Sequence, residues 1–191
     1  MRRWLTLLLF APALHAASLE IRYPALERLI AQQMFTQEGR RYVRGNQGAK
    51  CTFAFLESPK LLSGDASRIE LRVRFTGRSA VDMFGRCLGL GDSFDLTITG
   101  VPVARNGSVS FDQLTVSTPR DSYYIRRVRT GLLQTMNKDF RIDVRDQARS
   151  LLEAPRVTGV YEQEIKDLRV TSVRATAEAL ILEVDFRLIV K

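Results

Sequence analysis

The carboxyl-terminal segment constrains the fold most strongly. From Leu180 to Val190 an apolar side chain stands at every second position, with polar or charged side chains between most of them. The apolar positions are Leu180, Leu182, Val184, Phe186, Leu188 and Val190. Alternation with a period of two predicts a β-strand with one apolar face, which other elements of the fold must cover.

Two earlier stretches show the same period. "RIELRVRF", residues 68–75, places Ile69, Leu71, Val73 and Phe75 on one face and charged side chains on the other. We expect this strand to continue to about Gly77. "CTFAFLE", residues 51–57, also alternates, and Ser58-Pro59 is expected to end it. The basic stretch 40–50 between this strand and the first helix is interpreted as a loop or an irregular edge.

A hairpin follows farther along the chain. Residues 93–103 alternate through Phe94, Leu96 and Ile98, and "RNGS" comes directly after Ala104. Asn-Gly tolerates the positive φ angles of a type I′ turn, so 93–103 and 108–117 should pair antiparallel. The phase of the second strand changes near Asp112-Gln113, which predicts a β-bulge there.

Two segments have helical spacing. The first covers 24–36 and repeats apolar side chains at Leu26, Leu29, Ile30 and Met34. The second should begin after Pro119, with Asp121 or Ser122 as its cap, and run to about Lys138. Its apolar stripe is Ile125, Val128, Leu132 and Met136.

The remaining segments are less regular. Four glycines in 77–92 indicate a long connection held by Cys87, because their spacing fits neither phosphate-binding fingerprint. Residues 140–152 fit a strand or a helix, and a short helix is expected near 161–166. The order of elements predicts an α+β fold with long antiparallel strands. We expect one domain, residues 17–191, after a leader of residues 1–16.

The leader has the layout of a secretory signal. Arg2 and Arg3 precede an apolar run from Trp4 to Leu14, and small residues follow at Ala16 and Ala17. Cleavage near Ala16 would lower the formal net charge from +8 to +6. The first cysteine, Cys51, lies far from this point, so a lipid anchor is not expected. These features predict a periplasmic protein.

Cys51 and Cys87 are the two cysteines of the chain. An even pair in an exported protein predicts a disulfide. Closing a loop of this length contributes about 4 kcal/mol in the chain-entropy view of disulfides. A redox pair would usually be closer in sequence, and a zinc site would need more ligands.

Catalytic signals are weak. His15, the one histidine of the chain, lies in the leader, so triads that depend on histidine are not expected in the mature protein. Nearby carboxylate pairs remain conceivable for hydrolysis: Asp92 with Asp95, Asp139 with Asp143, and Glu162 with Glu164. Solvated strand or helix surfaces explain each pair equally well. We therefore expect no enzyme, no metal and no cofactor.

The sharpest basic cluster is "YIRRVR", residues 124–129. Arg126, Arg127 and Arg129 lie on the flank and outer side of the second helix. An anionic membrane surface fits this cluster better than nucleic acid does, since an exported protein rarely meets nucleic acid. The alternative interpretation is a solvated helix flank with no partner.

The order of elements resembles the tubular lipid-binding (TULIP) superfamily, and in particular its small bacterial envelope members. The resemblance covers about 20–190 and depends on "RIELRVRF", "PVARNGSVSFDQLTV", the helix from Asp121 and the terminal strand. It implies a strongly curved antiparallel sheet that wraps a long amphipathic helix, with a shorter helix near the amino terminus. The missing anchor cysteine and the Cys51–Cys87 pair are departures from that pattern.

The resemblance also implies a function. A slot between sheet and helix, lined by aliphatic and Phe side chains, suits acyl chains better than polar metabolites. The candidate lining residues are Ile69, Leu71, Val73, Phe75, Phe94, Leu96, Val128, Leu132 and Met136. The expected function is binding or shielding of a lipid-like ligand. The alternatives are an envelope interaction module without ligand and, third, a carboxylate hydrolase.

Overall fold

The computed structural model describes residues 17–62, 67–105, 107–119, 121, 123–139, 141–144 and 163–190. The expected secretory leader, residues 1–16, lies outside the described residues. The elements in chain order are β1 (Ala17–Arg22), α1 (Tyr23–Met34), β2 (Arg40–Arg44), β3 (Thr52–Leu62), β4 (Ile69–Met83), β5 (Arg86–Arg105), β6 (Ser108–Ser117), α2 (Tyr123–Asp139), β7 (Arg141–Asp143), β8 (Gln163–Ala175) and β9 (Ala179–Val190).

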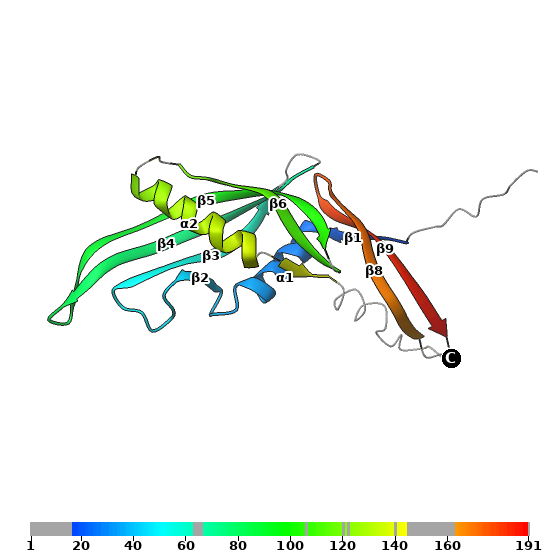
Figure 1. Cartoon of the computed structure of the whole chain (residues 1–191), viewed down its shortest axis with the longest axis horizontal. Helices are drawn as coiled ribbons and strands as arrows, with labels where there is room; N and C mark the ends of the chain where they lie inside the picture. Colours follow the sequence, from blue (N-terminus) through cyan, green and yellow to red (C-terminus); the bar gives the residue numbers. More distant parts are fainter. Residues whose placement is uncertain are drawn as a thin grey trace, which may run out of the picture.

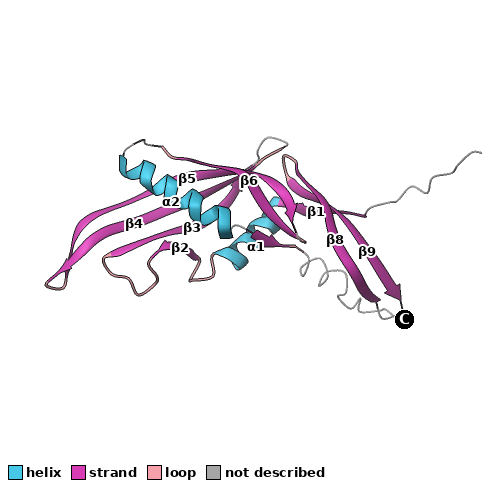
Figure 2. Cartoon of the chain, in the orientation of Figure 1, coloured by secondary structure: helices cyan, strands magenta, loops and turns pink. Residues whose placement is uncertain are grey.

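These strands form two antiparallel sheets, both strongly curled (Figure 1). One has the order β2-β3-β4-β5-β6-β7, and the other has the order β1-β9-β8. The described part of the chain is therefore mostly β, with two helices (Figure 2). The predicted long antiparallel strands are confirmed. Helix α2 contacts β6 and β2, and the wrapping of this helix by the sheet stays a prediction.

One hydrophobic core joins both sheets and both helices. Helix α1 contributes Leu26 and Ile30, both almost fully buried, and α2 contributes Leu132. The predicted apolar face of β9 is confirmed at Leu180, Leu182 and Val184, which are buried in the same core, whereas Val190 at its end is exposed. These side chains belong to the helical and alternating patterns of the sequence, so burial of these stripes holds the two sheets together.

The β4–β5 hairpin corrects the prediction for 77–92. This stretch is no connection: β4 and β5 pair without a register shift from Ile69–Gly100 to Met83–Arg86. Gly85 lies in the turn of this hairpin, and Gly89 permits close approach between the two strands. A Cβ atom on Gly89 would lie 2.3 Å from the carbonyl oxygen of Ser79. The hairpin projects to the end of the molecule opposite β8 and β9 (Figure 1).

The edge of the six-stranded sheet also differs from prediction. Strand β3 does not end at Ser58-Pro59 but continues to Leu62, because a bulge between Glu57 and Lys60 accommodates the proline. Ser58 takes a positive φ of 54° in this bulge. Of the two interpretations of 40–50, the irregular edge is confirmed for the first part of the stretch, because β2 is an edge strand of this sheet and its register with β3 shifts between Tyr42 and Arg44.

Other predictions have mixed outcomes. The β5–β6 hairpin is confirmed by the pairing of Arg105 with Ser108, and a register shift with Gln113 at a φ of 51° confirms the bulge. Both predicted helices are confirmed within one or two residues. The prediction of a short helix near 161–166 is wrong, because strand β8 begins at Gln163. The strand β1 was not predicted.

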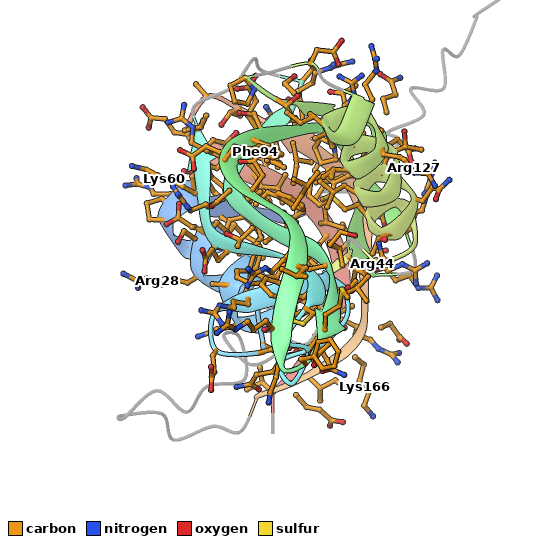
Figure 3. All side chains as sticks on the ribbon, turned by 90° about the vertical axis from the view of Figure 1, so that its left-hand side faces the viewer. Arg28, Arg44, Lys60, Phe94, Arg127 and Lys166 are labelled. Atoms are coloured by element: carbon orange, nitrogen blue, oxygen red, sulfur yellow. A yellow bond between two sulfur atoms is a disulfide. The ribbon has the colours of Figure 1, made fainter. Side chains whose placement is uncertain are left out.

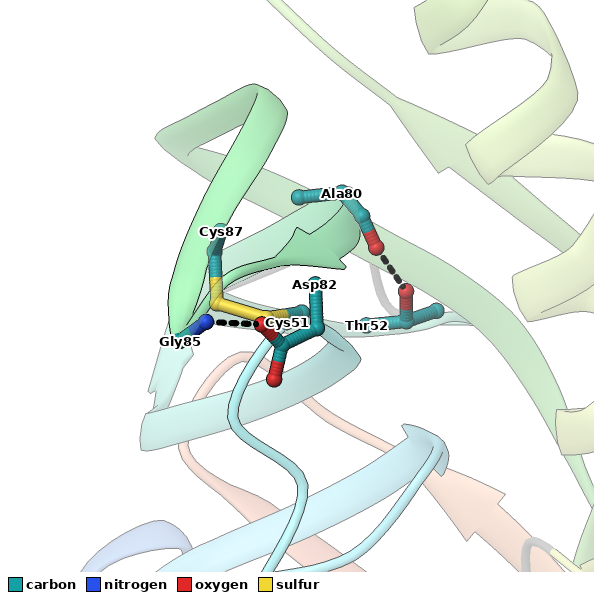
Figure 4. The surroundings of a disulfide bond; sticks show 6 residues. All are labelled: Cys51, Thr52, Ala80, Asp82, Gly85 and Cys87. Carbon is teal, nitrogen blue, oxygen red and sulfur yellow. Dashed lines mark hydrogen bonds between the residues drawn. A yellow bond between two sulfur atoms is a disulfide. The ribbon is translucent and has the colours of Figure 1, made fainter.

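The disulfide between Cys51 and Cys87 is confirmed, with a Cα–Cα distance of 5.2 Å (Figure 4). Hydrogen bonds reinforce the bridge: Ala80 N donates to the Cys51 carbonyl oxygen at 2.9 Å, and Thr52 Oγ1 donates to the Ala80 carbonyl oxygen at 2.9 Å. The bridge therefore fastens the start of β3 to the projecting hairpin. A disulfide indicates an oxidising compartment.

Neither helix in the described part of the chain is long and apolar enough to cross a lipid bilayer.

Candidate ligand-binding cavity

A cavity of about 560 Å³ lies between α2 and the six-stranded sheet. Four strands, β2 to β5, form one wall and α2 forms the other. The volume falls within the roughly 300–1,000 Å³ of typical small-molecule sites. The lining residues are Val43, Arg44, Phe53, Ala54, Phe75, Arg78, Ser79, Leu90, Arg127, Val128, Gly131, Leu132, Gln134 and Thr135.

The floor of this cavity is apolar. Phe75 and Leu132 are each 1% exposed, and Phe53 and Val128 are half-buried beside them. Phe75 belongs to the alternating face of "RIELRVRF", and Val128 and Leu132 stand four residues apart on one side of α2. Sheet alternation and helical periodicity thus direct apolar groups toward the same space.

The rim of the cavity is basic. Arg44, Arg78 and Arg127 line it from three different elements, and all three are exposed. Figure 3 shows Arg44 and Arg127 on the same side of the molecule, with Arg28 and Lys60 on the other. Among the described residues, the side chains of Arg44 and Arg78 have no carboxylate partner, in contrast to Arg74 with Asp95 at 3.6 Å. The rim therefore carries positive charge that an anionic group could neutralise.

Two other voids against the described part of this sheet are small. A second void, beside Leu71 and Met136, holds about 20 Å³, and a third, beside Ile69 and Leu71, holds about 10 Å³. Spaces of this size admit about one water molecule at most. In the stripe of "RIELRVRF", Ile69, Leu71 and Val73 are buried in the core, and Phe75 lines the large cavity.

The predicted lining residues divide into three groups. Phe75, Val128 and Leu132 line the large cavity. Phe94 is half-buried and packs on Phe75, with ring centroids 5.0 Å apart. The others are buried in the core away from this cavity: Ile69, Leu71, Val73, Leu96 and Met136. A role in ligand binding stays a prediction for all nine.

Sequence reasoning missed most of the rim. Arg44 lies in β2, in the stretch interpreted as a loop or an irregular edge, and Arg78 lies in β4, in the stretch interpreted as a long connection. Leu90, which also lines the cavity, lies in β5, in the same stretch 77–92 as Arg78. A signal was present, because Ser79, Val81 and Met83 continue the period of two that begins at Ile69. The nearby glycines instead led to the interpretation of 77–92 as a connection.

The other candidate sites show ordinary surface contacts. Arg126 forms an ion pair with Asp121 at 3.5 Å, and both side chains are more than half exposed. Of the three arginines in this basic cluster, Arg127 alone lines the cavity. Asp92 Oδ1 accepts a hydrogen bond from Ser93 N, and Asp95 pairs with Arg74. Glu162 lies outside the described residues.

Comparisons with known proteins add little. No family model matches the chain, and no curated protein matches it. The chain is similar to a crystal structure of lipopolysaccharide binding protein at 13% identity, over 90% of this chain and 50% of that chain, with a TM-score of 0.26. The chain thus spans about half the length of that protein. A TM-score this low carries no argument, so membership of the TULIP superfamily stays a prediction.

Proposed function

We propose that this protein binds a lipid-like hydrophobic ligand in the cavity between α2 and the six-stranded sheet, without catalysis. The observation that carries the proposal is the cavity itself, about 560 Å³ in volume. On this proposal the curled sheet wraps α2 around the bound ligand, and the protein works in the periplasm.

The distribution of side chains supports an amphiphilic ligand. Transfer of apolar surface from water to the floor around Phe75 and Leu132 is favourable, by about 25 cal/mol for each Å² buried. An acyl chain supplies apolar surface and needs no hydrogen-bonding partners. A negatively charged headgroup would lie at the rim, where Arg44, Arg78 and Arg127 can donate charge-assisted hydrogen bonds.

Gly131 offers a direct test of this site. It lies in α2 on the cavity lining, and a Cβ atom added there would meet nothing within 4 Å. A large side chain at this position can therefore enter open space without disturbing the core. Gly131→Trp should obstruct the cavity, whereas Gly131→Ala leaves it almost unchanged and improves helix propensity by up to about 1 kcal/mol.

The experiment has two parts. Protein purified without detergent is analysed by native mass spectrometry for bound lipid, and binding of a fluorescent fatty acid is followed by titration. We expect the wild-type protein and Gly131→Ala to bind the probe, and Gly131→Trp to bind it at least about tenfold more weakly, a difference of about 1.4 kcal/mol. Equal binding by all three proteins, or binding by none, would refute the proposal.

A further inference from the structure

The outer part of the β4–β5 hairpin exposes an unusual amount of apolar surface. Phe84 is 101% exposed, Leu90 77%, Val81 68%, Leu88 58% and Met83 49%. We call these five residues the tip patch. The other large apolar side chain with high exposure in the described part of the chain is Val190, at the far end of β9. Clustered apolar side chains on a projecting element usually mark a contact surface.

The tip patch continues the core face of the sheet. Because the β4–β5 register runs unshifted, the pair Val81–Leu88 lies on the same face as the pair Phe75–Phe94. Leu90 belongs both to this patch and to the cavity lining. The floor of the cavity and the tip patch therefore lie on one face of the hairpin, with the pairs Gly77–Asp92 and Ser79–Leu90 between them.

The turn at the end of the hairpin gives an independent argument. Met83 pairs with Arg86, so Phe84 and Gly85 form a two-residue turn, with φ angles of 52° and 78°. Such turns favour Asn-Gly or Asp-Gly, and a bulky residue at positive φ is strained. Phe84 contacts little of its own chain, because it is fully exposed. Its aromatic ring therefore serves no evident purpose in the fold and suits an external apolar partner.

Shape and charge indicate what that partner is. The tip patch is convex and narrow, so a rigid protein surface would need a matching hollow, whereas a lipid layer deforms around it. Arg78 and Arg86 are exposed beside the patch, and Lys50 adjoins the disulfide that holds the hairpin. Asp82 is also exposed there, but its Oδ1 accepts a hydrogen bond from Gly85 N at 2.9 Å and stabilises the turn. With Arg44 and Arg127 at the rim of the cavity, positive charge prevails around the hairpin.

We propose that the tip patch inserts into the surface of an anionic phospholipid bilayer, which places the cavity mouth against the lipid and lets an acyl chain pass along this face of the hairpin into the cavity. The second half of this statement rests on the function proposed above, whereas the insertion stands on the hairpin alone.

The test uses vesicles of phosphatidylglycerol with phosphatidylethanolamine, and of phosphatidylcholine alone. Phe84→Asn removes the aromatic ring and favours the positive φ, so this variant should fold at least as well as the wild type. Val81→Asp is a second variant, and Val190→Asp is its matched control at the other end of the molecule. In flotation assays we expect both tip variants to bind anionic vesicles at least about tenfold more weakly than the wild type. Val190→Asp should bind like the wild type.

A spectroscopic reporter makes the test direct. Trp4 is the one tryptophan of the chain, so Trp4→Phe combined with Phe84→Trp leaves a single indole at the tip. Its emission should shift to the blue with anionic vesicles and be quenched by brominated lipid. Unchanged emission, or vesicle binding by Phe84→Asn equal to the wild type, would overturn the insertion. A dimer that Phe84→Asn dissociates, without vesicle binding, would also overturn it and identify a second copy as the partner.

The two proposals fail in different ways. Phe84→Asn should keep its affinity for a soluble fluorescent fatty acid, and Gly131→Trp should lose that affinity while it still binds vesicles. If no variant binds the fatty acid but the tip variants alone lose vesicle binding, the ligand proposal fails and the insertion stands. If fatty acid binds normally and vesicles do not, the insertion fails.

Discussion

The rings of Phe75 and Phe94 pack against each other across β4 and β5, with centroids 5.0 Å apart and planes inclined by 35°. Phe75 is buried, whereas Phe94 is only half-buried. From this pair toward Ile69 the sheet face is covered by core, and from it toward Val81 the same face is exposed. The pair therefore marks the border between packed and open surface on one continuous sheet.

Arg44→Glu should weaken binding of an anionic fatty acid, because the substitution places a carboxylate at the basic rim. We expect a loss of about threefold or more, consistent with the small energies of exposed ion pairs. The loss should shrink in 1 M salt, where the screening length falls to about 3 Å. Arg28→Glu makes the same change of charge on the other side of the molecule (Figure 3). An equal loss in Arg28→Glu would contradict the assignment of the rim.

Replacement of both cysteines, Cys51→Ser with Cys87→Ser, should lower the free energy of unfolding by up to about 4 kcal/mol. The disulfide closes a loop across a sequence separation of 36 residues, and its removal frees that loop in the unfolded chain. Urea denaturation with and without reductant measures the effect. Reductant should destabilise the wild type to the level of the double variant and leave the double variant unchanged. A wild type insensitive to full reduction would contradict this expectation.

Gly89→Ala should loosen the β4–β5 hairpin, since the new Cβ atom would lie 2.5 Å from the Cα atom of Ala80 and even closer to the carbonyl oxygen of Ser79. Backbone atoms cannot yield as a flexible side chain does. Gly91→Ala is the matched control, because its nearest contact, at 3.4 Å, is ordinary. Hydrogen exchange of the hairpin amides should accelerate in Gly89→Ala alone. Equal protection in both variants would show that the strands tolerate the change.

Tyr23→Phe tests the junction between α1 and the β8–β9 hairpin. Tyr23 Oη donates a hydrogen bond to the Thr176 carbonyl oxygen at 2.6 Å, so its loss should lower stability by about 1 kcal/mol near pH 7. Burial raises the pKa of Tyr23. The unfolded phenol ionises near pH 10, below the folded pKa, so unfolding releases a proton in that range. The advantage of the wild type should therefore shrink as the pH rises above about 10. A constant difference from pH 7 to 11 would contradict this account.

The sequence predicted those elements whose pattern is local. The strand that ends at Val190 and the helix that contains Leu132 were found because periodicity alone defines them. The hairpin beyond Gly77 was missed, because glycine usually signals a turn and here it lets two backbones approach. Pro59 was expected to end strand β3, because proline has no N–H to donate to a neighbouring strand. The strand continues because Pro59 lies in a bulge, where no such hydrogen bond is required.

The candidate site was predicted only in part. Phe75 and Leu132, two of the predicted lining residues, both line the cavity, and their role in ligand binding stays a prediction. Whether such a face is packed or left open depends on how far α2 extends along the sheet, which is a property of the tertiary structure. The arginines of the rim come from β2, β4 and α2 and have no common sequence motif.

The disulfide between Cys51 and Cys87 lies on the opposite side of the β4–β5 hairpin from Val81 and Leu88. Cys87 stands opposite Asp82 in the ladder, so it lies on the reverse side of the ribbon from Val81 and Leu88. Near the end of β4, even-numbered positions therefore lie on the side of the disulfide, and the odd-numbered positions Val81 and Met83 belong to the tip patch. Insertion of a single residue between Gly77 and Val81 would turn Val81 and Met83 to the side of the disulfide, whereas Leu88 and Leu90 in β5 would keep their orientation.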